Sequence, residues 1–131
     1  MEFDELYRQA KAVLNPRRLS REAEAGGVGA ALLTESGRVY VGVCIDTSSS
    51  MGFCAEHAAA AAMIPAGENR VVKMVAVNWD GMILPPCGRC REFIGQLHEE
   101  NPHAEVLVSK GTIMTLRDLL PFDWRVVARG Q

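Results

Sequence analysis

The sequence predicts a single α/β domain in which helices pack on a mixed β-sheet. Helical and strand-like segments follow one another in the order helix, strand, strand, helix, strand, helix, strand, and such an order is typical of layered α/β folds. Of the 131 residues, 48% are apolar and 23% are charged, which is ordinary for a globular protein. Because this length suits one domain of the commonest size, we expect residues 1–131 to form one unit.

The N-terminal part of the chain is predicted to form a helix and a β-hairpin. Apolar side chains recur at helical spacing until Pro16 ends the pattern. Further on, Gly37 lies in a turn between two apolar runs, which is a hairpin signal. The predicted segments are a helix over Glu2–Leu14, a loop over Pro16–Gly27, and strands over Gly29–Thr34 and Arg38–Val43.

The rest of the chain is predicted to alternate between helices and strands. The segment before Pro65 contains only good helix formers, and a later run of Val, Met and Ala indicates a buried strand. The predicted segments are helices over Cys54–Ile64 and from Cys87 or Gly88 to Glu100, strands over Val71–Asn78 and Ala104–Ser109, and a helical turn over Leu116–Leu120.

The charge and the apolar segments of the sequence argue against nucleic acids and membranes as partners. Lys and Arg number 14 against 16 Asp and Glu, a net charge of −2, whereas nucleic-acid-binding domains usually carry a basic face. The longest apolar stretch, Ala58–Pro65, is too short to span a bilayer. The acidic start at Met1–Glu5 is unlike a signal peptide. We therefore expect a cytoplasmic protein, in which cysteines more often bind metals or react than form disulfides.

Three of the four cysteines lie in two short motifs, Cys54-Ala55-Glu56 and Pro86-Cys87-Gly88-Arg89-Cys90. Thiolates favour zinc, and three of them leave the fourth tetrahedral position free, as catalytic zinc sites do. Each motif opens a predicted helix, where free backbone N–H groups and the helix dipole favour thiolate over thiol. The motifs therefore predict one zinc ion held between two helix N-termini.

Glu56 is expected to carry protons rather than to bind the metal. A carboxylate is a poor ligand for a soft metal site beside three thiolates. Zinc lowers the pKa of a coordinated water to about 7, so a neighbouring carboxylate can accept its proton. Without the cysteines, an acidic residue in a first helical turn would need no function beyond stabilising the helix.

The two motifs resemble those of the cytidine deaminase superfamily, and the likeness extends over most of the chain. Val28–Leu33 and Gly37–Tyr40 look like the first hairpin of that family, and Leu119-Leu120-Pro121 looks like its C-terminal turn. The short chain with three cysteines is similar to the small tetrameric enzymes that act on free nucleosides. Pro86–Arg91, followed later by Leu119–Pro121 and Trp124, looks especially like blasticidin S deaminases.

The resemblance implies a three-layer fold with a mixed sheet of about five strands and helices on both faces. It implies that Cys54, Cys87 and Cys90 hold Zn²⁺ while water attacks C4 of a cytosine ring. Glu56 would move a proton to N3 and then to the departing amine, which leaves as ammonia. The substrate would be a free nucleoside or a nucleoside antibiotic resembling blasticidin S. The alternative is ordinary cytidine or deoxycytidine salvage, and a homotetramer is implied in either case.

Substrate contacts are expected from Cys44, Asp46, Ala55 and Trp124 by the same resemblance. The family holds the ribose hydroxyls with an Asn-x-Glu segment, where this chain has Cys44-Ile45-Asp46. Asp46 can accept a hydroxyl hydrogen bond, but a thiol cannot replace an amide that both donates and accepts. Members of the family place an aromatic residue after Leu-Leu-Pro, and it often reaches a base in a neighbouring subunit. By alignment Trp124 takes this position here, with Phe122 as the other candidate.

Other interpretations of these residues remain open at this point. Cys87 and Cys90 could be a redox pair with Cys54 in the core, or the three cysteines could form a structural zinc site. The fourth ligand would then be His57, Cys44 or His98. Arg89 and Arg91 could offset the thiolate charge or simply be solvated. A deaminase that edits nucleic acids is disfavoured, because the chain has no evident basic groove.

Overall fold

The computed structural model describes all 131 residues, and its regular elements are four helices and seven strands. In chain order they are α1 (Phe3–Ala12), β1 (Arg17–Arg18), β2 (Glu24–Thr34), β3 (Val39–Asp46), α2 (Ala55–Met63), β4 (Val71–Asn78), β5 (Ile83–Leu84), α3 (Gly88–Gln96), β6 (Glu105–Ser109), β7 (Thr112–Thr115) and α4 (Trp124–Arg129). None of the helices is both long enough and apolar enough to cross a membrane.

The strands form one mixed sheet whose five longer members lie in the order β3-β2-β4-β6-β7. Only β4 and β6 pair in parallel, and every other pair is antiparallel. The two-residue strands β1 and β5 pair with β2 and β4 respectively. The predicted mixed sheet of about five strands is therefore confirmed, with two short additions.

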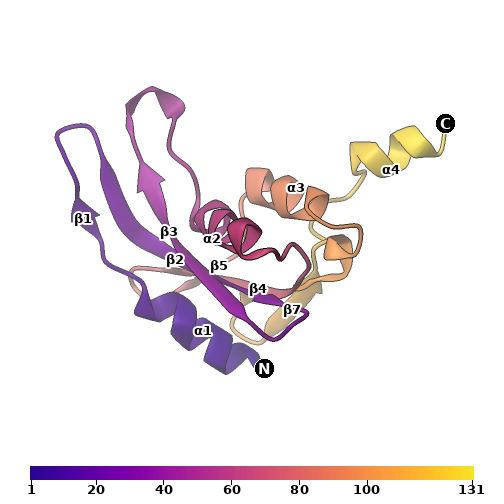
Figure 1. Ribbon diagram of the computed structural model, residues 1–131, viewed down its shortest axis with the longest axis horizontal. Helices are drawn as coiled ribbons and strands as arrows, with labels where there is room; N and C mark the ends of the chain where they lie inside the picture. The colour runs from indigo at the N-terminus through magenta and orange to yellow at the C-terminus, as the bar shows by residue number, and fades with distance from the viewer.

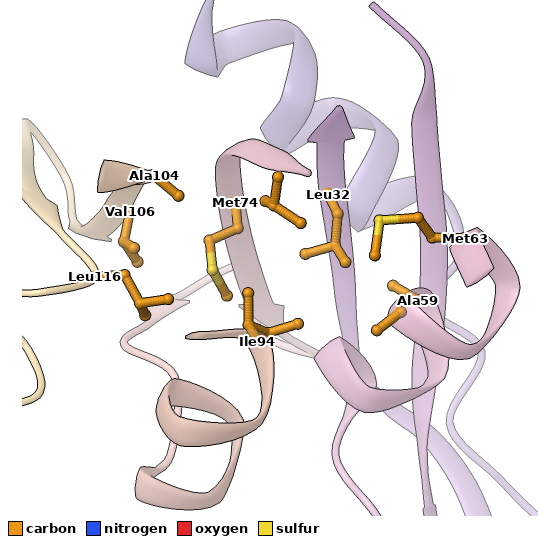
Figure 2. Packing of buried hydrophobic residues seen from close by; sticks show 10 residues of the cluster. Leu32, Ala59, Met63, Met74, Ile94, Ala104, Val106 and Leu116 are labelled. Atoms are coloured by element: carbon orange, nitrogen blue, oxygen red, sulfur yellow. The ribbon is translucent and has the colours of Figure 1, made fainter. Parts of the chain in front are cut away.

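Helices cover both faces of this sheet, as Figure 1 shows: α1 lies on one face, and α2 and α3 lie on the other. On the second face, Leu32 of β2 and Met74 of β4 pack with Met63 of α2 and Ile94 of α3 (Figure 2). Under α1, Leu6 and Ala10 pack with strand residues such as Val75. The sheet thus separates two apolar clusters, and the three-layer prediction is confirmed.

The sequence prediction missed the beginning of β2, because residues up to Gly27 had the composition of a loop. The structure begins β2 at Glu24 and accommodates a register shift between Ala25 and Gly29. Gly26 has φ +85°, and a Cβ there would lie 2.0 Å from the Asn15 carbonyl oxygen. Only glycine permits this close passage beside the end of α1.

β3 continues beyond its predicted end at Val43, because Ile45 and Asp46 pair with Ala25 and Glu24. Cys44 and Asp46 consequently lie on a strand and not in the loop after it. The isolated bridge between Ile45 and Phe53 then ties the following loop back to this strand.

Helix α3 ends at Gln96, four residues before the predicted end at Glu100. The buried side chain of Asn101 is hydrogen-bonded to the end of this helix. Its Nδ2 donates to the Ile94 carbonyl oxygen over 2.8 Å, and the same oxygen accepts from the Leu97 backbone N–H over 3.2 Å. Its Oδ1 also accepts from the Val71 backbone N–H over 2.8 Å, which ties α3 to the start of β4.

Replacing Asn101 by alanine is expected to lower the free energy of unfolding by about 2–4 kcal/mol. The change leaves the buried N–H of Val71 without a partner and removes two more hydrogen bonds, to the carbonyl oxygens of Ile94 and Asn69. Urea unfolding followed by circular dichroism measures the loss. Asn69→Ala is the matched control, since this exposed side chain makes one hydrogen bond, to Leu97, and should cost about 1 kcal/mol. Equal losses in both variants would contradict the expectation.

Helix α2 approaches β3 so closely that only glycine fits at Gly42. A Cβ there would lie 2.4 Å from the Ala59 backbone nitrogen and 2.8 Å from the Ala55 carbonyl oxygen. The small side chains of α2 permit this contact, which places the first turn of α2 against the sheet.

Gly42→Ala is therefore expected to destabilise the protein by about 1–3 kcal/mol, because backbone atoms of α2 must move away. Thermal unfolding measures the change. Gly27→Ala is the control, since its nearest non-neighbouring atom would be Trp79 Cδ1 at 3.9 Å. If the unfolding temperature of Gly42→Ala is no lower than that of Gly27→Ala, then α2 can move away from β3 without a loss of stability.

Candidate metal and active site

A cavity of about 360 Å³ opens where α2 and α3 begin, between the strands β3 and β5. Its wall brings together residues that lie far apart in the sequence. They are Val28, Cys44, Asp46, Gly52, Phe53, Cys54, Ala55, Glu56, Ala76, Leu84, Pro85, Cys87 and Arg89. Most of the wall is apolar, so the few polar groups are well placed to orient a bound molecule.

The three thiols of Cys54, Cys87 and Cys90 form one cluster, with all Sγ atoms within 4.8 Å of one another. Cys54 and Cys87 are the N-cap residues of α2 and α3, with extended backbone, and Cys90 lies one turn into α3. The predicted meeting of two helix N-termini is thus present in the fold. No other group of three His, Cys, Asp or Glu side chains in the molecule could hold a metal ion.

The cluster fits a tetrahedral zinc site. Zn–S bonds of about 2.3 Å place the sulfurs of such a site roughly 3.8 Å apart. The Sγ atoms of Cys54 and Cys87 lie 3.2 Å apart, so they would separate by roughly 0.6 Å to hold zinc. Three sulfurs would leave one position of a tetrahedral ion free.

The pKa values of the three thiols also indicate that a cation would be needed to keep them ionised together. Burial, followed by the hydrogen bond with Cys87, raises the pKa of Cys54 to about 11. Burial and the nearby charge of Glu56 raise the pKa of Cys90. Burial opposes ionisation of Cys87 as well, but hydrogen bonds from Cys90 and Cys54 leave its pKa lowered. Three crowded thiols thus resist ionising together until a divalent cation balances their charge.

Glu56 lies in the first turn of α2, where its side chain is buried and lines the cavity. Burial is the main reason why the pKa of this carboxyl is raised. A carboxyl group in that environment is suited to exchanging protons with a neighbouring molecule.

Three of the four expected substrate-binding residues, Cys44, Asp46 and Ala55, line this same cavity. The thiol of Cys44 accepts a hydrogen bond from the Val28 backbone N–H over 3.3 Å. Asp46 is exposed at the end of β3. The side of the cavity formed by β3 thus presents a sulfur and a carboxylate.

Trp124 does not reach the cavity of its own chain. Its indole Nε1 donates to Glu92 Oε1 over 2.7 Å, and its ring is 60% exposed. Phe122, the other candidate, is 93% exposed. Figure 1 shows α4 projecting from the body of the molecule at the C-terminus.

The proposed fourth ligands of a structural zinc site are not part of the thiol cluster. His57 stacks on Phe93, with ring centroids 3.7 Å apart, and His98 Nδ1 accepts from the Glu100 backbone N–H. Cys44 lines the cavity but is also outside the cluster. The two arginines interact with carbonyl oxygens: Arg89 with that of Gly52, and Arg91 with those of Pro86 and Leu119.

Residues 2–108 match the model of a known family, described as the cytidine and deoxycytidylate deaminase zinc-binding region. The chain belongs to this deaminase family. Cytidine deaminase of Mycobacterium tuberculosis is 35% identical to it over 96 residues, which are 72% of this chain and 69% of that protein. Cytidine deaminase of Halalkalibacterium halodurans is 33% identical over 97 residues, 72% and 74% of the two chains.

Solved structures of cytidine deaminases share the fold. The cytidine deaminase from Mycobacterium leprae has a TM-score of 0.78 and 29% identity, covering 92% of this chain and 98% of that one. For the cytidine deaminase from Mycobacterium tuberculosis, the TM-score is 0.79 with 28% identity, covering 95% and 98%. The protein is therefore a zinc-dependent enzyme of the cytidine deaminase type.

The loop over Thr47–Phe53 was expected to shape the mouth of the pocket, and its Gly52 and Phe53 line the cavity. Two other cavity residues, Val28 and Leu84, were not predicted. Val28 and Leu84 carry no chemical signal of their own. They line the cavity because β2 and β5 flank β4 in the sheet.

Proposed function

We propose that this cytidine-deaminase-type enzyme removes the exocyclic amine from C4 of the cytosine ring in a free nucleoside. The observation that carries the proposal is a cavity lined by two thiols of a three-thiol cluster and by one buried carboxyl, Glu56. The cavity volume of about 360 Å³ is of the size that binds small molecules.

Cys54, Cys87 and Cys90 would hold the metal. When bound, zinc lowers the pKa of a coordinated water to about 7 and so supplies a nucleophile at neutral pH. Glu56 accepts the proton of the attacking water and delivers it to N3 of the ring. It then takes the remaining proton of the new hydroxyl at C4 and passes it to the amine, which leaves as ammonia while C4 becomes a carbonyl. The apolar wall, including Ala55 and Ala76, limits water beside the ring.

The side of the cavity formed by β3 favours a second candidate substrate, a nucleoside antibiotic such as blasticidin S. At Cys44 the chain offers a thiol that already accepts the Val28 N–H, and a thiol cannot both donate and accept as an amide does. Ribose hydroxyls therefore have fewer strong partners here, and Asp46 supplies the main acceptor.

Ammonia release by zinc-loaded protein distinguishes the candidates when measured with cytidine, deoxycytidine, cytosine and blasticidin S. Fast turnover of cytidine or deoxycytidine supports nucleoside salvage. Turnover of blasticidin S alone supports the antibiotic as substrate. If none of the four releases ammonia from folded protein with zinc bound, the proposed substrate class is wrong.

Replacing Cys44 by asparagine is expected to raise kcat/KM for cytidine about fivefold relative to blasticidin S. The amide can donate to and accept from a ribose hydroxyl, and one such bond contributes about 1 kcal/mol. Steady-state kinetics on both substrates measures the ratio. Cys44→Ser is the control, since it keeps the side-chain size without an amide. A ratio that rises equally in both variants would show that the amide is not responsible.

We further propose a homotetramer in which Trp124 or Phe122 reaches the cavity of a neighbouring chain. The exposure of these two aromatic rings and of Val126 supports it, because large apolar side chains clustered on a surface commonly mark an interface. Sedimentation equilibrium at micromolar concentration tests this proposal, and a monomeric mass would contradict it. The cytoplasmic location stays a prediction.

A further inference from the structure

The side chain of Arg91 links two backbone segments beside the thiol cluster. Arg91 follows Cys90 in α3 and is half-buried. Its Nε donates to the Pro86 carbonyl oxygen over 2.7 Å, and its Nη1 donates to the Leu119 carbonyl oxygen over 2.9 Å. One guanidinium group therefore joins the turn before Cys87 to the C-terminal part of the chain.

The first of these bonds acts on the segment that presents Cys87. Pro86 directly precedes Cys87, and no other donor reaches its carbonyl oxygen. β5 ends at Leu84, so residues 85–87 have no strand partner. Cys87 is an N-cap residue without a side-chain cap bond, and its side chain is exposed. Arg91 is thus the side chain that fixes the peptide group joining Pro86 to Cys87.

The second bond fixes the guanidinium itself. No other donor reaches the Leu119 carbonyl oxygen, and the segment that follows is held on α3 at two more points. Trp124 donates to Glu92, and Arg125 Nη1 donates to the Gly95 carbonyl oxygen over 3.1 Å. Arg91 is therefore held at both ends of its planar group.

We propose that Arg91 is a positioning residue that keeps the Cys87 thiol within reach of Cys54 and Cys90, and that zinc affinity depends on this. The rigid fork of a guanidinium can satisfy two carbonyl oxygens at fixed positions, whereas the single nitrogen of lysine cannot reproduce that geometry. Residues that orient a metal ligand without touching the metal commonly change its affinity 10- to 100-fold when replaced.

Arg89 also belongs to the beginning of α3, but its side chain has different partners. Its Nη1 donates across the cavity to the Gly52 carbonyl oxygen over 3.2 Å, and its side chain lines the cavity. Arg89 does not donate to the Pro86 carbonyl oxygen, whereas Arg91 does. The positioning role is therefore specific to Arg91.

The experiment measures zinc affinity by competition with a chromogenic chelator, which requires no substrate and is therefore independent of the proposed reaction. Arg91→Met should bind zinc at least tenfold more weakly than the unmodified protein. Arg91→Lys keeps the positive charge and should lie within threefold of Arg91→Met. In the cobalt-substituted protein, both variants should lose intensity in the sulfur-to-cobalt charge-transfer absorption, because Cys87 is no longer held in place.

Arg125→Met is the matched control, since it removes an arginine bond to the same helix at Gly95, far from Cys87. It should lower Tm but change zinc affinity less than twofold. The proposal is wrong if Arg91→Lys binds zinc like the unmodified protein, because the positive charge alone would then suffice. It is also wrong if the zinc affinity of Arg91→Met falls less than twofold, or if that of Arg125→Met falls as far as that of Arg91→Met.

If Arg91→Met does not fold, a variant that keeps one of the two hydrogen bonds of Arg91 replaces it in the experiment. Arg91→Gln retains an amide donor for the Pro86 carbonyl oxygen and should show intermediate zinc affinity. Affinity equal to that of the unmodified protein would overturn the proposal as well.

Discussion

Glu56→Gln is expected to reduce ammonia release by between about a hundredfold and ten-thousandfold while zinc stays bound. The carboxyl of Glu56 is buried in the cavity wall beside the thiol cluster, where it can take a proton from water and pass it to the substrate. An amide keeps the shape of this side chain but cannot carry that proton, and general acid–base catalysis commonly contributes rate factors of this size.

Two measurements on the same sample separate chemistry from metal binding. Steady-state ammonia release on the best substrate of the four gives kcat, and elemental analysis gives zinc per chain. Glu99→Gln is the matched control, because this glutamate is exposed on the surface after α3. If Glu56→Gln released ammonia at the unmodified rate, another group would have to move the protons.

Removing the metal is expected to abolish activity and to leave a protein that zinc restores. A strong chelator in excess should remove the ion, since it can bind at an open coordination position and then compete with the three thiolates. Activity should fall below detection after dialysis and return when stoichiometric zinc is added. Failure of zinc to restore activity in protein that remains folded would argue against a catalytic metal.

Single cysteine variants identify the ligands. Cys90→Ala removes a fully buried thiol of the cluster and should reduce zinc content to well below one ion per chain. Cys44→Ala is the matched control, because its thiol lies in the same cavity but outside the cluster, and it should keep one ion per chain. Loss of zinc from Cys44→Ala would make Cys44 a fourth ligand and favour a structural site.

Local patterns predicted the parts of the fold that local chemistry decides. β4 lies where its run of Val, Met and Ala indicated, at Val71–Asn78. The helix starts at Cys54 and Cys87 follow from the motifs, because only helix N-termini allow Cys54 and Glu56 to face one small object. The chemistry of the metal site was therefore predictable from the sequence.

The missed features depend on contacts between distant segments. β5 has two residues and exists because it pairs with Ala76 and Val77 of β4. The last turn of α3 is hydrogen-bonded by Asn101, a side chain from beyond the helix. The C-terminal helix α4 begins where Asp123 accepts from the Arg125 backbone N–H. No periodicity within these short segments could have predicted them.

The separation of the two apolar clusters by the sheet has a consequence for protein engineering. The cavity, the thiols and Glu56 all belong to the side that carries α2 and α3, whereas Leu6 and Ala10 of α1 pack on the opposite face. Stabilising substitutions usually reduce activity when they stiffen a catalytic region. Redesign of the α1 layer can therefore raise thermal tolerance with little trade-off against turnover, and a library confined to that layer is the place to seek a robust biocatalyst.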